Sequence, residues 1–241
     1  MPNMTGIHIF SNKYLFRAWT IRNLCVMALA SVFLLIFPPS LAAETPTLAN
    51  IIAQMQDRYD KTQDFKARFS QEATLRTANR TEREEGTVYF RNPKRMRWEY
   101  SVPKGKLLVI NPEKAWLYLP DDRLVYVQDA EKMLQSGLAI KFLTGLGRLS
   151  EDFQISHASP QKTDREGNHL LVLAPRDAGA GMDKLSITVD KTSYSIIQFS
   201  MSDFAGNTTR IEFRNIVLNS KLPDRLFQFN IPAGVEAVPL P

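Results

Sequence analysis

Cysteine is almost absent: the 241-residue sequence contains one, Cys25, within an apolar stretch near the N-terminus. A single cysteine cannot form a disulfide within the chain, which excludes the small disulfide-stabilised scaffolds of secreted proteins. Because the stretch around Cys25 is predicted below to be removed, we expect no thiol chemistry in the remaining protein. Its stability must come from buried apolar side chains, and about 198 residues are enough for one sizeable core.

Histidine and the common catalytic motifs are equally sparse. Of three histidines only His157 and His169 follow the N-terminal segment, and neither has neighbours at metal-ligand spacing. The sequence Gly145-Leu146-Gly147 lacks the Gly-Lys-Ser/Thr of a phosphate loop, so we interpret it as a helix end. A Gly-x-Ser-x-Gly nucleophile motif does not occur. We therefore predict no metal site, no cofactor and no enzymatic activity.

The first 43 residues have the pattern of a cleavable secretion signal. Three basic residues and no acidic ones precede the apolar run Leu24–Phe37, which is the order of a signal peptide's basic and hydrophobic regions. The run of about fourteen residues is shorter than the roughly 17–25 that cross a bilayer, so a permanent anchor is the less favoured alternative. Small residues end the segment. We predict cleavage after Ala42 or Ala43, which leaves residues 44–241 as one mature domain.

Excess positive charge is concentrated in that N-terminal segment. The formal net charge is +5, and residues 1–43 contain three of the 30 basic residues and none of the 25 acidic ones. The mature chain therefore has a net charge of +2, which gives little support for a nucleic-acid partner. A remaining basic cluster is interpreted as a solvated strand edge; its members are Arg91, Lys94, Arg95 and Arg97.

Periodicity predicts an α+β domain dominated by strands. Apolar spacing of three and four predicts a helix over residues 46–60, capped by Thr45 with Pro46 in its first turn, and a second helix over 129–144 capped by Asp129. About eleven strands without β-α-β alternation predict one large antiparallel sheet, which must close, cover its edges or curl. Strands with period two are expected at 65–75, 84–91, 95–101, 106–110, 115–119, 123–128, 153–158, 169–174, 184–190, 195–203 and 207–217, with a short last one at 227–229.

Apolar and aromatic side chains concentrate on one face of neighbouring strands. Met96, Trp98 and Tyr100 share a face, as do Val88 and Phe90 in the preceding strand. For any single residue, a plain hydrophobic core is the simpler interpretation. As a set, they suit a curved sheet whose concave face is apolar and holds an apolar ligand.

These residues resemble the LolA family of periplasmic lipoprotein carriers. The segment Phe65–Gln71 matches the F-x-A-x-F-x-Q pattern of the family's opening strand, and Gly86–Pro93 followed by Trp98 resembles its G-x-hydrophobic-aromatic block. Three later segments also resemble the family: Leu108–Ile110 leading to Ala115–Tyr118, Ile196–Phe199, and Phe227–Val235. Their order and spacing extend the resemblance over nearly the whole mature chain.

The resemblance implies an incomplete, unclosed antiparallel β-barrel with helices forming a lid over an apolar cavity. It also implies a monomer in the periplasm that receives acylated lipoproteins from an inner-membrane ABC lipoprotein-release transporter and delivers them to an outer-membrane lipoprotein receptor. The residues expected to bind acyl chains are, from the sheet, Phe65, Phe69, Val88, Phe90, Met96, Trp98, Tyr100 and Trp116, and, from a lid that moves aside on loading, Met55, Leu134, Leu138 and Phe142.

One position departs from the family pattern. Many members carry an arginine just before the proline that corresponds to Pro93, where it helps to govern lid closure and cargo release. This chain has Asn92 there, with Arg91 one residue earlier. By strand alternation Arg91 points to the opposite face, so it is not an obvious substitute. Asn92 is therefore the predicted lid-control position, with hydrogen-bonding capacity but no charge.

Other functional classes compete with the carrier. A periplasmic lipid- or lipoprotein-binding sensor, or another lipid shuttle, is compatible with the same fold, whereas an esterase is disfavoured because no nucleophile motif is present. The outer-membrane receptor shares the carrier's fold but needs an acylated cysteine just after its hydrophobic run. Cys25 is the second residue of that run and cannot serve as this anchor, which favours the carrier.

Overall fold

The computed structural model describes residues 46–136, 149–176, 184–203 and 205–240, and the statements below refer to these residues. The chain divides into two units, Met1–Thr45 and Pro46–Pro241, of which the second contains all the described elements. The predicted secretion signal, together with Leu138 and Phe142 of the predicted lid, lies outside the described residues.

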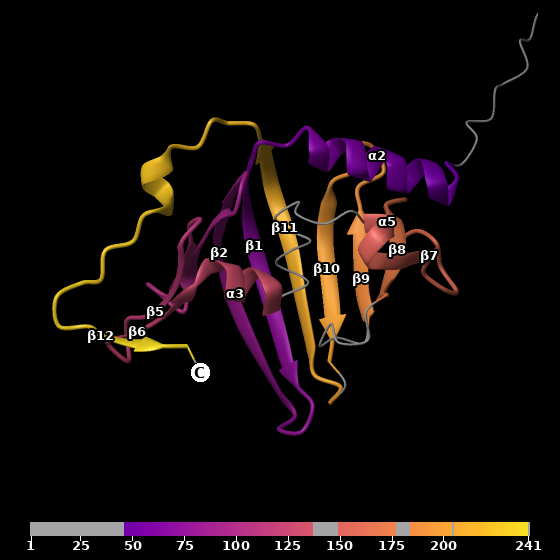
Figure 1. Cartoon of the computed structure of the whole chain (residues 1–241). Coiled ribbons are helices and arrows are strands. Elements are labelled where there is room, and N and C mark those ends of the chain that lie inside the picture. Colours follow the sequence, from indigo (N-terminus) through magenta and orange to yellow (C-terminus); the bar gives the residue numbers. More distant parts are fainter. Residues whose placement is uncertain (1–45, 137–148, 177–183, 204, 241) are drawn as a thin grey trace, which may run out of the picture. The chain divides into compact units, whose positions relative to one another are not determined.

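Twelve strands of the described chain form one continuous sheet (Figure 1). Every neighbouring pair is antiparallel except β12 with β6, which is parallel, and the end strands β12 and β7 do not pair with each other. The prediction of an unclosed, mainly antiparallel sheet is thus confirmed. In spatial order the strands are β12 (Glu236–Pro239), β6 (Leu124–Asp129), β5 (Lys114–Leu119), β4 (Leu107–Ile110), β3 (Arg95–Val102), β2 (Arg80–Arg91), β1 (Asp64–Leu75), β11 (Thr208–Leu218), β10 (Ile196–Ser202), β9 (Lys184–Val189), β8 (His169–Pro175) and β7 (Phe153–His157).

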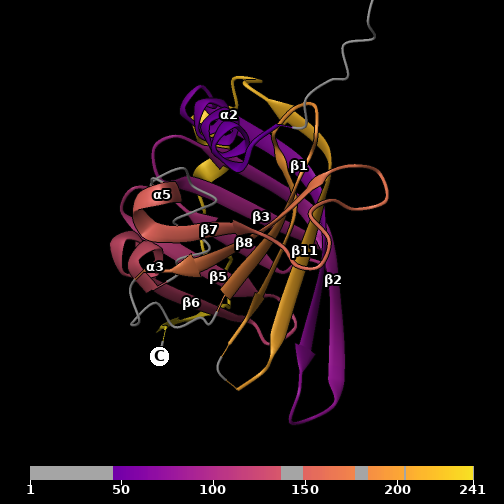
Figure 2. The ribbon, with the colours of Figure 1, turned by 90° about the vertical axis from the view of Figure 1, so that its right-hand side faces the viewer.

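Three short or medium helices, α2 (Leu48–Asp60), α3 (Ala130–Ser136) and α5 (Leu149–Asp152), lie on the same side of β1, β2 and β11 (Figure 2). The helix α2 begins two residues later than predicted, because the Thr47 hydroxyl accepts a hydrogen bond from the Asn50 N–H at 3.3 Å and so acts as the cap. The Asp129 carboxylate, predicted to cap the second helix, instead pairs with Lys114 at 3.0 Å. Only the first part of that helix, α3, falls within the described residues.

Alternation along β1 builds the inner face of the sheet, defined here as the face that carries the main hydrophobic cluster. Ala67 and Phe69 are buried in that cluster, while their neighbours Lys66 and Arg68 are exposed. From α2, Ile51 and Met55 are each 1% exposed and join the same cluster. The helix and the inner face of the sheet therefore share one core.

The C-terminal segment corrects the prediction of a last short strand at 227–229. Phe227 ends a 3-10 helix, η1 (Asp224–Phe227), and is 1% exposed, while the true last strand is β12, nearer the C-terminus. Residues 219–235, termed here the strap, run from β11 toward β12 on the side of β2 to β6 (Figure 1). Two arginines of the sheet hold the strap: Arg91 donates to the Leu222 carbonyl at 2.8 Å and Arg97 to the Leu226 carbonyl at 3.1 Å. The outer face of these strands is thus covered.

Candidate functional site

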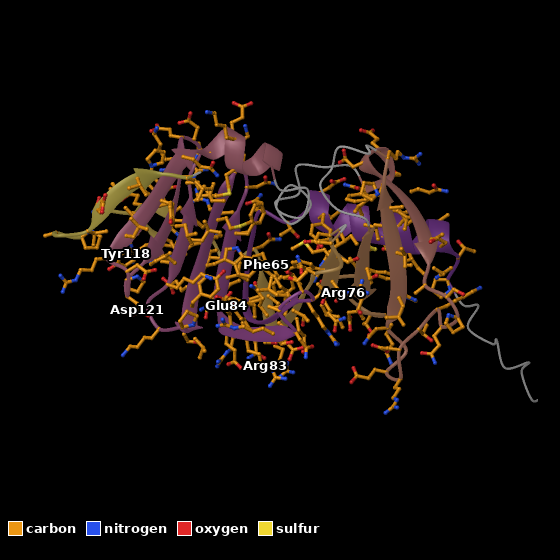
Figure 3. The ribbon with its side chains drawn as sticks, turned by 90° about the horizontal axis from the view of Figure 1, so that it is seen from below. Phe65, Arg76, Arg83, Glu84, Tyr118 and Asp121 are labelled. Atoms are coloured by element: carbon orange, nitrogen blue, oxygen red, sulfur yellow. The ribbon has the colours of Figure 1, made fainter. Side chains whose placement is uncertain are left out.

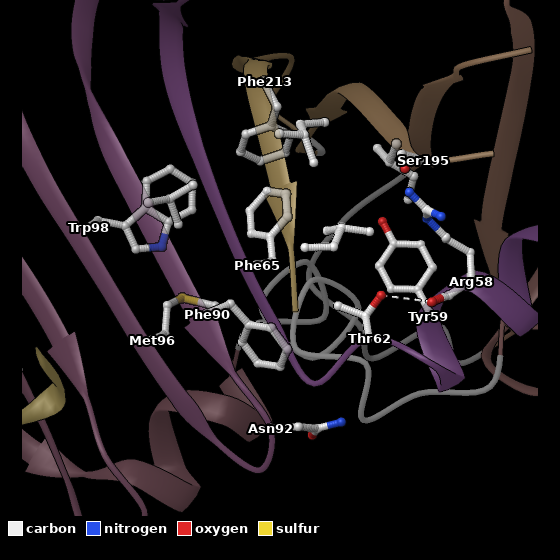
Figure 4. A pocket seen from close by; sticks show the side chains of 14 residues that line it. Arg58, Tyr59, Thr62, Phe65, Phe90, Asn92, Met96, Trp98, Ser195 and Phe213 are labelled. Atoms are coloured by element: carbon white, nitrogen blue, oxygen red, sulfur yellow. Dashed lines mark hydrogen bonds between the residues drawn. The ribbon is translucent and has the colours of Figure 1, made fainter. Parts of the chain in front are cut away.

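A small apolar cavity of about 40 Å³ lies between α2 and the inner face of the sheet (Figure 4). Most of its lining residues are aliphatic or aromatic, and four are polar. Phe65 and Phe213, from the adjacent strands β1 and β11, meet edge to face in this lining with their ring centroids 5.6 Å apart. The lining consists of Arg58, Tyr59, Thr62, Phe65, Val88, Phe90, Asn92, Met96, Trp98, Ser195, Ile196, Phe213, Ile216 and Leu218.

Five of the residues predicted to bind acyl chains line this cavity. Strand register brings them together: Phe65 stands opposite Phe90, Phe90 stands opposite Met96, and Val88 stands opposite Trp98. Residues that face each other across neighbouring strands point to the same side of a sheet. The alternation read from the sequence thus gathers these five side chains on one wall.

Three other predicted residues lie next to the cavity without lining it. The Phe69 ring packs edge to face on Trp98 at 4.6 Å and on Tyr100 at 5.2 Å, which continues the aromatic wall beyond the cavity. Met55 packs in the core that α2 shares with the sheet. Gly86 makes room for the Phe69 ring, because a Cβ at Gly86 would lie 2.8 Å from its Cε1 atom.

The prediction that Trp116 belongs to this wall is wrong. Its strand neighbour Ala115 is in the inner core, so Trp116 faces outward, where its ring lies 6.1 Å from Phe229 of the strap. Tyr118, on the same outer side, lies 5.7 Å from Phe229. Leu134 falls within α3, but the structure does not describe its side chain. Leu138 and Phe142 lie outside the described residues.

The predicted lid-control residue Asn92 lines the cavity, and its backbone N–H donates to the Gln63 carbonyl at 2.8 Å. As alternation predicts, Arg91 lies on the other face, where its guanidinium pairs with Asp224 of the strap at 3.0 Å. The basic cluster read as a solvated edge therefore includes side chains that fasten the strap. Arg91 supplies no charge to the cavity.

Sequence reasoning missed the part of the lining contributed by α2, β10 and β11. Tyr59 follows the apolar spacing of the predicted helix 46–60, and Phe213 alternates within the predicted strand 207–217. Nothing in the sequence indicates that these elements meet β2 and β3. Burial raises the pKa of the Tyr59 hydroxyl, although a backbone hydrogen bond from Ile196 opposes the shift. That bond ties α2 to the start of β10.

The polar residues Arg58 and Thr62 lie on the side of the cavity next to α2, whereas Trp98, Phe90 and Met96 lie on the opposite side (Figure 4). The Thr62 hydroxyl donates to the Arg58 carbonyl at 2.7 Å and is satisfied within the helix end. An amphiphile would therefore find an apolar wall on the strand side and polar groups on the helix side.

The cavity is too small for an acyl chain as it stands. A water molecule needs about 10–15 Å³ of such space, so about 40 Å³ has room for only a few water-sized groups. Core side chains pack closely and leave few voids. A long ligand can enter only if α2 or other covering elements move away from the sheet.

Two further features bear on the kind of chemistry. Among the described residues, no group of three or more His, Cys, Asp or Glu side chains could hold a metal ion. No helix in that part of the chain has the length and apolar character needed to cross a membrane. His169 stacks on Tyr194 at 6.1 Å, and burial, with His157 nearby, lowers the pKa of its imidazole.

The sequence is similar to one described protein family and to named members of it. The family model described as "Outer membrane lipoprotein carrier protein LolA" matches residues 60–230. A protein from Pseudomonas aeruginosa PAO1 named outer-membrane lipoprotein carrier protein is 29% identical over 220 residues, covering 90% of this chain and 98% of the relative. One of the same name from Legionella pneumophila Lens is 30% identical over 209 residues, covering 86% and 96%. The crystal structure of an uncharacterized conserved protein from Thermus thermophilus has a TM-score of 0.49 at 14% identity, covering 80% and 98%.

Proposed function

The chain belongs to the family of the outer membrane lipoprotein carrier protein LolA, and from this premise we propose that it carries lipoproteins through the periplasm by sheltering their acyl chains beneath α2. The observation that carries the proposal is the apolar cavity between the helix and the sheet, lined by Phe65, Phe90 and Trp98. No bond is made or broken in this function. The mature protein, residues 44–241, acts as a monomer after removal of the signal.

The energetics of acyl chains determine how such a carrier works. Burying one methylene stabilises by about 0.8 kcal/mol, so a chain of roughly sixteen carbons gains on the order of 12 kcal/mol on leaving water. Release into water therefore does not compete with release to another apolar surface. Cargo passes directly from an inner-membrane ABC lipoprotein-release transporter to this protein, and from this protein to an outer-membrane lipoprotein receptor.

Loading requires the closed arrangement to open. The tie between Tyr59 and Ile196, together with the burial of Met55, holds α2 against the sheet in the empty protein. Acyl chains replace these contacts with equivalent apolar ones, so the free-energy difference between closed and loaded states stays small. Leu134, Leu138 and Phe142 act with Met55 as the lid, and Asn92 at the cavity edge controls its closure.

The proposal is tested with purified mature protein and a synthetic triacylated lipopeptide. We expect a stable one-to-one complex with the lipopeptide and none with the same peptide lacking acyl chains. The lid assignment is tested with Phe142→Glu, which places a charge against the apolar site and should abolish loading. Normal loading by Phe142→Glu would contradict the lid assignment alone.

Co-purification separates the carrier from the alternatives. Protein isolated from the periplasm should contain triacylated lipoproteins when analysed by mass spectrometry. Recovery of free phospholipid or glycolipid instead would support another lipid shuttle, and recovery of no apolar species, combined with no binding of the lipopeptide, would reject both. The transfer step is then tested by delivery of the loaded lipopeptide to vesicles that contain the outer-membrane receptor.

A further inference from the structure

An ion pair lies on the inner face of the sheet, just beyond the aromatic wall. The Lys106 ammonium and the Glu84 carboxylate are 2.5 Å apart, and their side chains are only 21% and 13% exposed. The Gln71 amide also donates to Glu84 at 2.8 Å. These three side chains form a hydrogen-bonded polar group that borders the aromatic rings of Phe69 and Tyr100.

Strand register shows that this group belongs to the same face as the cavity. Gln71 is two residues beyond Phe69 on β1, so the two side chains share a face, and Gln71 stands directly opposite Glu84. Arg83, the neighbour of Glu84 on β2, instead pairs with Glu72 and is 78% exposed. Figure 3 labels Arg83 and Glu84 together with Phe65. On β1, the inner face thus changes from aromatic at Phe69 to polar at Gln71, which is the next residue on that face.

Tyr100 stands at this boundary. On one side its ring packs against Phe69 at 5.2 Å, and on the other the Lys106 ammonium lies 4.4 Å from the ring centroid. Phe69 in turn contacts Trp98, which lines the cavity. A continuous series of ring contacts therefore runs from the cavity to the ion pair and ends there.

We propose that Gln71, Glu84 and Lys106 form a polar floor that limits how deeply an acyl chain enters and so sets the chain length that the protein prefers. The inference rests on the proposed function, because it specifies the ligand of the same site. Each methylene that lies against the aromatic wall leaves water for an apolar surface. A methylene at the floor would have to lie against an ion pair that is already desolvated and paired, and it gains nothing there.

The position of the floor fits a single extended chain. Phe65, which lines the cavity, and Gln71 are separated by six residues of β1, which corresponds to roughly 20 Å at about 3.3 Å per residue. One leaflet of the hydrocarbon core of a bilayer is about 15 Å deep. The apolar wall is therefore long enough to accommodate the depth that a chain occupies in one leaflet of a membrane.

The experiment measures affinity along a homologous series of triacylated lipopeptides with chains from lauroyl to arachidoyl, by displacement of a fluorescent polyene fatty acid. In the natural protein, affinity should rise about fourfold per methylene per chain and then level off. In Glu84→Leu/Lys106→Leu, which removes both charges together and so avoids an unpaired buried ion, the plateau should move to longer chains. Glu72→Leu/Arg83→Leu removes a matched ion pair from the outer face and should leave the plateau unchanged.

The outcomes separate the floor from the function it rests on. An unchanged plateau in the inner double variant, with short-chain affinity retained, overturns the floor. If that variant does not fold, Glu84→Gln/Lys106→Met, which keeps the amide hydrogen bond to Gln71, is measured against the same expectation. Failure of the natural protein to bind any member of the series would instead refute the proposed function.

Discussion

The carboxylate of Asp64 accepts two hydrogen bonds from Ser220, one from its backbone N–H at 2.7 Å and one from its hydroxyl at 2.9 Å. The Lys221 N–H donates to the other carboxylate oxygen at 2.8 Å, and Asp64 is only 3% exposed. Asn219 and Lys221 adopt positive φ values of 55° and 59°, so the backbone of this loop turns its N–H groups toward the carboxylate. The first residue of β1 thereby anchors the start of the strap.

Replacing this anchor should cost stability. Asp64→Ala leaves several N–H groups without an acceptor in a buried place, and we expect the free energy of unfolding to fall by about 2–3 kcal/mol. Urea denaturation followed by tryptophan fluorescence measures the change. Asp57→Ala serves as the control, because its ion pair with Lys61 is exposed, with 54% of the aspartate side chain accessible, and should cost less than about 0.5 kcal/mol.

The same carboxylate should make the protein sensitive to acid. Burial alone would raise the pKa of Asp64, but the hydrogen bonds from Ser220, Lys221 and Leu222 together outweigh it and hold the pKa below 3.8. A carboxyl with a lowered pKa in the folded state contributes stability that is present above the unfolded value and is lost as the pH falls through the folded value. Natural protein should therefore lose more stability than Asp64→Asn between about pH 4 and pH 2. Parallel acid-unfolding curves for the two proteins would contradict this assignment.

Tyr59→Phe should loosen the lid without changing the shape of the cavity. The substitution leaves the Ile196 N–H without its partner, and the loss of about 1 kcal/mol from the closed state favours opening roughly fivefold. We expect faster hydrogen exchange in α2 and a roughly fivefold gain in apparent affinity for the lipopeptide. Tyr89→Phe is the control, since it removes a hydroxyl that bonds to Glu99 on the outer face. Equal effects of the two variants would argue against a role for the Tyr59 tie.

Two tryptophans on opposite faces should separate stability from binding. Trp98→Ala removes a side chain that is 6% exposed and should cost about 3–5 kcal/mol, together with a large loss of lipopeptide affinity. Trp116→Ala loosens the contact with Phe229 and should cost about 2 kcal/mol, because this side chain is only partly buried. Lipopeptide affinity should not change in Trp116→Ala once both proteins are compared under folded conditions. A loss of affinity in this variant would return Trp116 to the binding site.

Gly86→Ala tests the close approach of β2 and β3 beneath the aromatic wall. An added Cβ would overlap the Glu99 carbonyl oxygen, which is backbone and cannot move aside alone. We expect a loss of about 3 kcal/mol in unfolding free energy. Gly234→Ala is the comparison: Gly234 has a positive φ of 76° but nothing within 4 Å of a Cβ, so only its backbone conformation resists and the cost should be about 1–2 kcal/mol. Similar losses would show that packing at Gly86 is not tight.

The alternation of apolar and polar residues predicted some strands well and others poorly. Alternation located β1, β3 and β8 to within a residue or two, because side chains of a half-buried strand must alternate between core and solvent. It failed at the start of β2, where Arg80–Arg83 are polar and exposed on both faces and carry no periodic signal. It also failed for β12, a short strand with only one partly buried residue.

The sequence by itself determined which side chains share a face, and hence the wall of Phe65, Val88, Phe90, Met96 and Trp98, because period two follows from the geometry of the strand. Only the tertiary structure decided which face of the sheet is the inner one in the strands where α2 packs on one side and the strap on the other. The outward position of Trp116 holds an apolar side chain, and there the strap packs on it. The residue pattern alone cannot distinguish this surface, which a distant segment covers, from the inner core. The same holds for Asp64, whose partners lie at the other end of the chain, and for Tyr59, whose partner is in β10. Such contacts depend on how separate elements are brought together, which local propensity does not encode.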